Sequence, residues 1–284
     1  MPDFTMLTQP FLLHTWVSGT IVAVIAAVIG FFIVIRGSAF VAHALPEAGF
    51  AGGAGAVYLQ LNPLYGLIAF SVCGALLIGS MSKKAHHDAI TALMLVTSLG
   101  IGALFLGLSD RYASGAYALL FGQIVGVSTD QITGTAVVGV LCLIGLAVLF
   151  RPLLLASVSP DIAAARGVPL RMLEAALLVI VALASSVIVP MVGALLCFSL
   201  LIVPNAASVR LTRTPGSALR LALLASVLDV WLAIALAVLS GWPIGFFVCM
   251  ISAAFYGFAR IRPSLHSRQT AHAAFKSPLR KSAR

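Results

Sequence analysis

Charged residues are scarce in this chain. Only 9% of its 284 residues are charged, whereas 61% are hydrophobic and the mean hydropathy is +1.11. Soluble domains contain about 25% charged residues, so this composition excludes a soluble globular protein and indicates an integral membrane protein. Because each membrane-spanning helix takes about 20 apolar residues, the length leaves no room for a sizeable soluble domain.

Three sequence motifs of enzymes are absent as well. No lysine follows a glycine, which excludes the P-loop Gly-x-x-x-x-Gly-Lys-Ser/Thr and ATP binding through it. Neither His-Glu-x-x-His nor Gly-x-Ser-x-Gly occurs, so two common hydrolase signatures are missing. We therefore expect that the chain is not an enzyme.

Cysteines are few and isolated, each inside an apolar run. They are Cys73, Cys142, Cys197 and Cys249. Neither a disulfide framework nor a Cys-x-x-Cys metal site fits this spacing, and we interpret all of them as packing residues.

The apolar runs are continuous rather than alternating, which favours helices over the period-two strands of a β-barrel. The predicted fold is an all-α, polytopic transmembrane bundle of about nine spans. The spans are expected at 16–35, 44–60, 63–81, 89–108, 131–150, 172–190, 191–209, 221–240 and 243–260.

Basic residues lie between these runs and in the C-terminal tail. The net charge of +9 therefore indicates the positive-inside pattern and no nucleic-acid partner. This pattern predicts the N-terminus outside and the C-terminus inside the cell. Residues 1–260 are expected to form the transmembrane domain, and 261–284 a disordered basic cytoplasmic tail that touches anionic lipid.

Two further segments stand out. Residues 115–127 are too short to cross a bilayer and predict a re-entrant or interfacial helix. In the basic loop 152–171, Ser159 can cap a helix that begins at Pro160 and Asp161 and stops at Gly167. This short helix fits either a simple connector or an element that docks into a partner's groove.

Ionisable residues inside apolar spans cost about 2.5–3.5 kcal/mol each at the helix centre, so they mark functional sites. The candidates are His43, Glu47 and Asp229. His43 and Glu47 share a helix face, and Pro46 predicts a kink there or a helix that begins near Pro46. The pair fits two ligands of a divalent cation, or a buried hydrogen bond that fastens two helices. Asp229 fits a polar contact between helices. It becomes a candidate for the same site only if it faces His43 and Glu47.

Four segments of the chain resemble the integral membrane permeases of ABC-type zinc and manganese importers. IGFFIVIRGSAFVAHALPEAGFAGGAGA resembles that family's Val-x-Arg-Arg and Ala-Phe-x-Gly-Asp-Ala-Leu-Ser-His-Ala-Ala. LLFGQIVGVS is similar to its Leu-Phe-Gly-x-Ile-Leu-x-Val-Ser, and SVSPDIAAARGVPLRMLE to its Asp-Pro-Glu-x-Ala-x-Ala-x-Gly-Val-Pro. VGALLCFSLLIVPNAASVRLT is similar to its Val-Gly-x-Leu-Leu-Val-x-Ala-Leu-Leu-x-Ile-Pro-Ala-Ala. The likeness covers roughly residues 10–260.

The resemblance implies a metal site with an inverted ligand order. Where the family has Asp this chain has His43, and where the family has His it has Glu47, so one imidazole and one carboxylate remain. Asp229 is the only ionisable residue in the penultimate span and would make the second contribution to the site. A transported zinc or manganese ion is implied, with no permanently bound cofactor.

The resemblance also implies partners and a location. The short helix would dock on a cytoplasmic ABC ATPase, through Pro160, Asp161, Ala164, Arg166 and Gly167. The permease would act as a homodimer in the bacterial cytoplasmic membrane, with an external metal-binding protein. Two alternatives remain: a proton-coupled secondary transporter whose Glu47 and Asp229 carry protons, and a membrane scaffold, which leaves the three ionisable groups unexplained.

Overall fold

The computed structural model describes residues 10–81, 87–108, 119–122 and 129–261, and the regular structure in these ranges is entirely helical. The all-α prediction is therefore confirmed. The helices are α1 (Pro10–Arg36), α2 (Ala39–Tyr58), α3 (Pro63–Met81), α4 (His87–Leu108), α6 (Thr129–Val158), α7 (Pro160–Ala165), α8 (Leu170–Val192), α9 (Ala194–Leu211), α10 (Pro215–Ser240) and α11 (Ile244–Ile261).

Every expected span overlaps one long helix of the described chain. Seven of these helices are long and apolar enough to cross a membrane, and α2 and α9 are not among them. Helix α2 contains His43, Pro46, Glu47 and four glycines, which lower its hydropathy, while the apolar part of α9 is short. The count of about nine spans is therefore not confirmed and stays a prediction.

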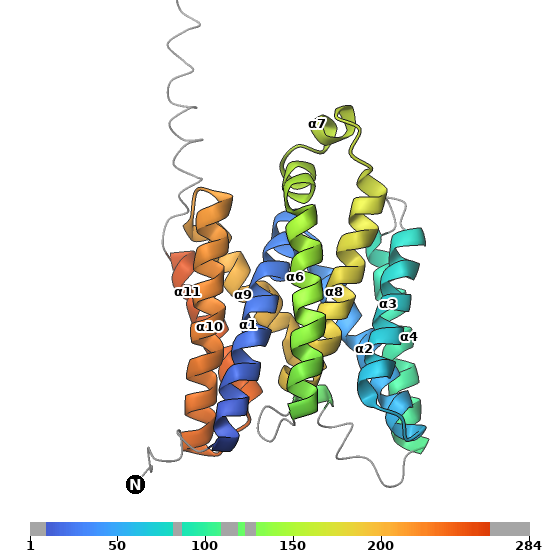
Figure 1. The fold of residues 1–284 in the computed structure, drawn as a ribbon, viewed down its shortest axis with the longest axis vertical. Coiled ribbons are helices and arrows are strands. Elements are labelled where there is room, and N and C mark those ends of the chain that lie inside the picture. Colours follow the sequence, from blue (N-terminus) through green and yellow to red (C-terminus); the bar gives the residue numbers. More distant parts are fainter. Residues whose placement is uncertain (1–9, 82–86, 109–118, 123–128, 262–284) are drawn as a thin grey trace, which may run out of the picture.

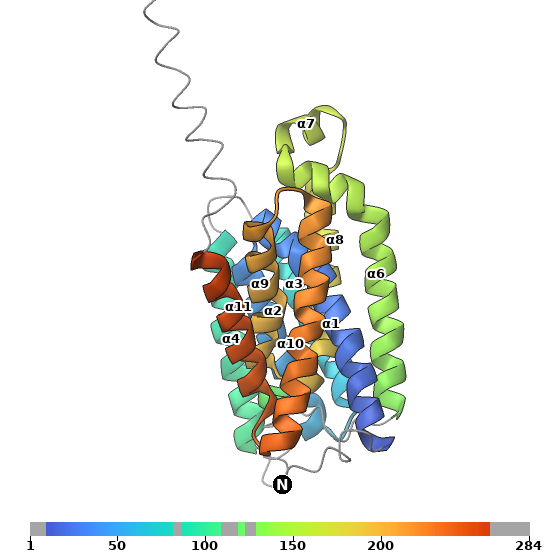
Figure 2. The same ribbon diagram turned by 90° about the vertical axis from the view of Figure 1, so that its left-hand side faces the viewer.

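The ends of the helices alternate between two faces of the bundle (Figures 1 and 2). The end of α1, helix α7, the junction of α9 with α10 and the end of α11 lie toward one face. Basic residues lie in or directly after these segments: Arg36 ends α1, Arg166 follows α7, and Arg210 and Arg260 lie in the last turns of α9 and α11. The start of α1 and the turns after α2 and α10 lie toward the opposite face. This arrangement agrees with the predicted alternation, and which face is cytoplasmic stays a prediction.

Helix α2 starts earlier than the sequence predicts and runs through its proline. The helix begins at Ala39, so the expectation that it begins near Pro46 is wrong. A proline inside a helix removes one backbone hydrogen bond, and packing of the helix against its neighbours can offset that loss. Glu47 consequently lies in the third turn of α2 and not in its first.

Helices α6 and α10 are longer than expected because each continues past the arginine that borders its apolar run, Arg151 in α6 and Arg220 in α10. Helix α6 continues through Pro152 to Val158, beyond the predicted end at residue 150. Helix α10 begins at Pro215, six residues before the predicted start at 221. There Thr214 and Ser217 form a capping box, which supplies hydrogen bonds for the exposed first turn.

Helix α2 lies inside the bundle, where it packs on α3, α4, α8 and α9. From Val41 to Ala56 it is buried almost throughout. Gly52 of α2 and Gly66 of α3 face each other so closely that a Cβ on either would clash with the carbonyl of the other. Small residues of this kind permit close helix contact in a membrane. The polar groups of α2 are thereby kept away from lipid.

We expect Gly30→Ala to destabilise the contact between α1 and α9. A Cβ at Gly30 would clash with the carbonyl of Leu201 and the amide of Asn205, whose Nδ2 donates to the Leu201 carbonyl at 2.9 Å. Overpacking of this kind costs about 1–3 kcal/mol. The measurement is the midpoint of thermal unfolding of the purified protein in detergent. Gly107→Ala, with open space at its Cβ, is the matched control. Equal midpoints for both variants would contradict the close packing.

Two predicted segments fall mainly outside the described residues. Of the expected re-entrant helix at 115–127, the structure describes only residues 119–122, where Leu119 is buried against Gly53 of α2. Of the tail at 261–284, it describes only Ile261, the last residue of α11. Both expectations stay predictions.

Candidate functional site

The polar centre of the bundle is the pair His43 and Glu47 on α2. Glu47 is 1% exposed and His43 is half-buried. Neither the Nδ1 atom of His43 nor the Oε2 atom of Glu47 has a hydrogen-bond partner among the described residues. A buried polar atom without a partner costs about 1–3 kcal/mol, and more when the group is charged. Such a cost calls for a compensating ligand.

Helix α9 covers this pair with two consecutive residues. The ring of Phe198 meets the imidazole of His43 edge to face, with ring centroids 5.3 Å apart. Cys197 is fully buried and lies within electrostatic range of the Glu47 carboxylate. The aromatic ring and the thiol thus exclude bulk solvent from the α9 side of the pair.

Helices α8 and α3 add hydroxyl groups around α2. Ser185 of α8 is fully buried beside the Cys197 thiol. Ser71 of α3 donates to the carbonyl oxygen of Leu45 at 3.2 Å. A Cβ at Gly49 would lie 2.5 Å from that hydroxyl, so glycine allows Ser71 to approach α2.

This arrangement suits a bound cation better than it suits a His–Glu hydrogen bond that fastens two helices. A histidine nitrogen and a carboxylate oxygen are the ligands of zinc and related divalent ions. The predicted alternative, a His–Glu hydrogen bond between helices, does not match the unpartnered atoms, and both residues belong to α2. In this conformation the described residues contain no group of three His, Cys, Asp or Glu side chains that could hold a metal ion.

The structure does not place Asp229 in one such group with His43 and Glu47. Asp229 is 3% exposed on α10, which packs on α1, α9 and α11. Its Oδ2 accepts a hydrogen bond from Ser252 of α11, while its Oδ1 has no partner among the described residues. Asp229 therefore forms the polar helix contact that the sequence left open, and its role as a metal ligand stays a prediction.

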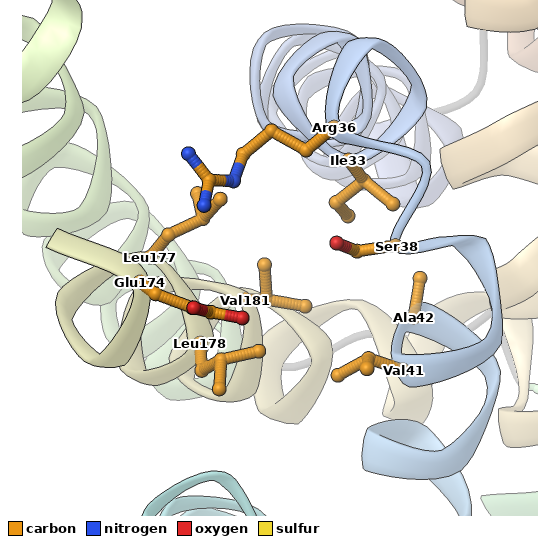
Figure 3. Close-up of a pocket in the computed structure, with 9 residues that line it drawn as sticks. All are labelled: Ile33, Arg36, Ser38, Val41, Ala42, Glu174, Leu177, Leu178 and Val181. Atoms are coloured by element: carbon orange, nitrogen blue, oxygen red, sulfur yellow. The ribbon is translucent and has the colours of Figure 1, made fainter. Parts of the chain in front are cut away.

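A small pocket opens near the first turn of α2, at the face that carries the basic residues (Figure 3). Arg36 at the end of α1 and Glu174 of α8 line it with Ser38. Val41 and Ala42, which directly precede His43, form part of its apolar wall. The pocket therefore places two opposite charges, Arg36 and Glu174, near the start of α2.

Helix α7 projects beyond the other helices at the same face (Figures 1 and 2). The sequence predicts this helix correctly from Pro160, although Ser159 makes no side-chain hydrogen bond as its cap. Gly167 follows with φ +76°, a conformation that favours glycine. The candidate coupling residues Pro160, Asp161, Ala164, Arg166 and Gly167 are all exposed. Only Ala163 is buried among the six residues of α7, and it packs into the hydrophobic core.

Sequence reasoning missed three residues of this region. Cys197 was interpreted as a packing residue, and neither Ser185 nor Glu174 was singled out. A buried serine gives no distinct signal in an apolar run, because it is a common residue there. Glu174 lies four residues into α8, where its charge could have marked it.

Comparisons with known proteins agree with this architecture. The family model described as "ABC 3 transport family" matches residues 8–262. The chain is 29% identical to the manganese import system permease protein ScaB of Streptococcus parasanguinis over 69% of this chain and 70% of that protein. It is 26% identical to the high-affinity zinc uptake system membrane protein ZnuB of Haemophilus influenzae over 75% of this chain and 82% of that protein.

A solved structure has the same fold. It is described as PsaBC from Streptococcus pneumoniae in complex with Fab, and the matched chain superposes with a TM-score of 0.80 at 23% identity. The alignment covers 89% of this chain and 92% of that chain. The helical architecture is therefore shared over almost the whole length.

Proposed function

This chain belongs to the ABC 3 transport family, and on that premise we propose that His43 and Glu47 line the path of a divalent metal ion through an ATP-driven importer. The observation that carries the proposal is the pair of unpartnered buried atoms, Nδ1 of His43 and Oε2 of Glu47. The chain is a permease subunit and not an enzyme, because it lacks the P-loop and its relatives are named as membrane components of metal uptake systems.

The cargo is zinc or manganese, as the names of the relatives indicate for those proteins. A metal dication in an apolar helix bundle needs a compensating anion, and Glu47 supplies one on a helix that lipid does not reach. Four glycines between Gly49 and Gly55 let the neighbouring helices pack closely around α2. No permanently bound cofactor is required, because the metal is cargo.

The energy comes from a separate ATPase subunit on the cytoplasmic face, docked on α7 and its flanking residues. The exposed apolar side chains there support a docking surface: Val158 is 70% and Ile162 is 50% exposed at a helix end beyond the bundle. An external metal-binding protein would deliver the ion at the opposite face. A homodimer in the bacterial cytoplasmic membrane completes the proposed assembly.

The proton-coupled alternative is not favoured. It required Glu47 and Asp229 to carry protons without an ATPase, whereas the family is one of ABC transporters. Asp229 of α10 also bonds to Ser252 of α11, and neither of these two helices is among those packed on α2 around Glu47.

Metal accumulation tests the proposed function directly. Cells that express the chain with its ATPase and binding protein are depleted of zinc and of manganese in turn, and their metal content is measured. We expect the full system to restore accumulation of at least one metal, in a manner that depends on the ATPase. Accumulation that persists without the ATPase would contradict the proposal and favour a secondary transporter.

We expect residue 160 to face the cytoplasm and residue 61 to face outside, because the basic helix ends gather at the face of α7. Single cysteines at Pro160 and Leu61, in a cysteine-free chain, are labelled with a membrane-impermeant reagent in intact cells. In intact cells we expect labelling at 61 and not at 160. Residue 160 is expected to be labelled once the cells are opened. Labelling at 160 from outside would invert the predicted topology.

A further inference from the structure

Four arginines gather where α9 ends, α10 begins and α11 ends. Arg210 is in the last turn of α9, Arg213 lies between α9 and α10, Arg220 is in the second turn of α10, and Arg260 is in the last turn of α11. These three helices pack on one another, and the ends concerned lie side by side at the face of α7 (Figures 1 and 2). We call these four arginines the basic corner.

The sequence places almost no acidic residue near the basic corner. After Glu174 the chain contains a single acid, Asp229, which is 3% exposed and bonded to Ser252 between α10 and α11. The basic loop 152–171 differs, because Asp161 lies within it and Glu174 follows it. An anion at this face is therefore attracted to the basic corner more strongly than to that loop.

Three of the four arginines present their side chains at the surface. Arg213, Arg220 and Arg260 are exposed. Nε of Arg220 donates to the carbonyl of Gly216 at 3.4 Å, which orients this side chain along α10. Arg210 is half-buried, and its Nε has no hydrogen-bond partner among the described residues. Because each guanidinium group offers several donors to one phosphate, the basic corner suits a phosphate ligand.

An exposed apolar row continues from the basic corner along α10. Leu224, Leu228 and Leu232 follow Arg220 at intervals of four residues, so they share its face of the helix, and each is more than half exposed. Arginine at the end of such a row holds its charge at the boundary between bilayer and water. A free inorganic anion makes no use of the row, whereas a phospholipid can cover it with acyl chains while its headgroup meets the arginines.

We propose that the basic corner binds the headgroup of an anionic phospholipid, whose acyl chains lie along Leu224, Leu228 and Leu232. Each basic residue beside a membrane surface strengthens the attraction of anionic lipid by about fivefold in affinity. The proposed ATPase contact is elsewhere, on α7, which projects beyond the ends of the other helices (Figure 1). A second copy of this chain placed symmetrically on the corner would bring like charges together, which disfavours it as the occupant.

Lipid binding to the purified permease–ATPase complex in detergent tests the site. Phosphatidylglycerol and phosphatidylcholine are titrated separately, and the bound lipid is counted by native mass spectrometry. We expect the wild type to bind phosphatidylglycerol at least about tenfold more tightly. This preference should fade as salt rises from about 0.1 M to about 1 M, because the Debye length falls from about 10 Å to about 3 Å. Equal affinities for the two lipids, or a preference that salt does not change, would overturn the proposal.

Paired substitutions locate the lipid at the basic corner. Arg213→Gln with Arg220→Gln removes two exposed charges and should weaken binding of phosphatidylglycerol about 10- to 30-fold. Arg213→Lys with Arg220→Lys keeps both charges and should retain the preference for this lipid. The matched control is Arg151→Gln with Arg171→Gln, at exposed positions of α6 and α8, and it should bind lipid as the wild type does. An equal loss in both glutamine pairs would show that only the overall charge attracts lipid, and the corner would be refuted as a site.

Inorganic phosphate distinguishes a lipid site from a site for a free anion. It carries negative charge but no acyl chains, so at the same concentration it should not displace phosphatidylglycerol from the wild type. Displacement by phosphate would overturn the assignment to lipid. None of these measurements involves a transported metal, so their outcome is independent of the roles proposed for His43 and Glu47.

Discussion

Metal uptake is expected to fall to background when Glu47 is replaced by glutamine. The substitution preserves the size of the side chain and removes its negative charge from a position that is 1% exposed. A divalent ion that enters the bundle then meets no carboxylate on α2, and an uncompensated dication in an apolar interior is very costly. His43→Gln removes the nitrogen ligand and should have a similar effect.

A loss of metal uptake through the missing ligand must be distinguished from a loss through misfolding. Ser208→Ala is the matched control, because the Ser208 hydroxyl is equally buried but donates only within its own helix, to the Pro204 carbonyl at 2.7 Å. All three variants should insert and co-purify with the ATPase, and only the two α2 variants should lose uptake. Normal uptake by Glu47→Gln would refute the site assignment.

A double variant, His43→Asp with Glu47→His, tests whether the order of the pair matters. It restores the family's order while it keeps one imidazole and one carboxylate, four residues apart on one helix face. We expect this variant to transport metal well above the level of Glu47→Gln. Radioactive zinc uptake by intact cells measures all of these variants on one scale.

Replacing Ala164 with glutamate is expected to uncouple the permease from its ATPase. Ala164 is exposed on α7, so the change should alter the stability of the isolated chain by less than about 0.5 kcal/mol. If α7 docks into a groove of the ATPase, the new carboxylate is buried there without a partner. Such a penalty is about 3 kcal/mol, which weakens the complex about 100-fold.

Gly167→Pro should act on the same element through the backbone. Gly167 has φ +76° and its N–H donates to the carbonyl of Ala164 at 2.9 Å. Proline can neither adopt that φ nor donate, so the end of α7 has to rearrange. Loss of co-purification and of permease-dependent ATP hydrolysis is the expected result for both variants.

Gly216→Glu is the matched control for these variants. It adds the same charge at the same face of the bundle, at an open position in the first turn of α10, where a carboxylate suits the helix dipole. Wild-type coupling is expected for this control. Wild-type coupling of Ala164→Glu and Gly167→Pro as well would show that α7 is a connector and not a docking element.

The sequence by itself determined the helical membrane architecture and the candidate ligands. Apolar runs of about 20 residues predict spanning helices because the bilayer imposes that length, and each run can be recognised without knowledge of its neighbours. The same local argument located His43, Glu47 and Asp229, since an ionisable group inside an apolar run is conspicuous wherever the helix lies. The basic residues at alternate helix ends likewise follow from the linear order.

Only the tertiary structure decided which groups surround those candidates. Helical periodicity tells which side chains share a face, but it does not tell which helix packs against that face, and Ser185 and Cys197 are distant from Glu47 in sequence. Helical periodicity also could not show that α2 continues through Pro46, because packing on four other helices offsets the lost backbone hydrogen bond. Asp229 was equally visible in the sequence, yet packing of α10 on α11 pairs it with Ser252 instead of the α2 pair.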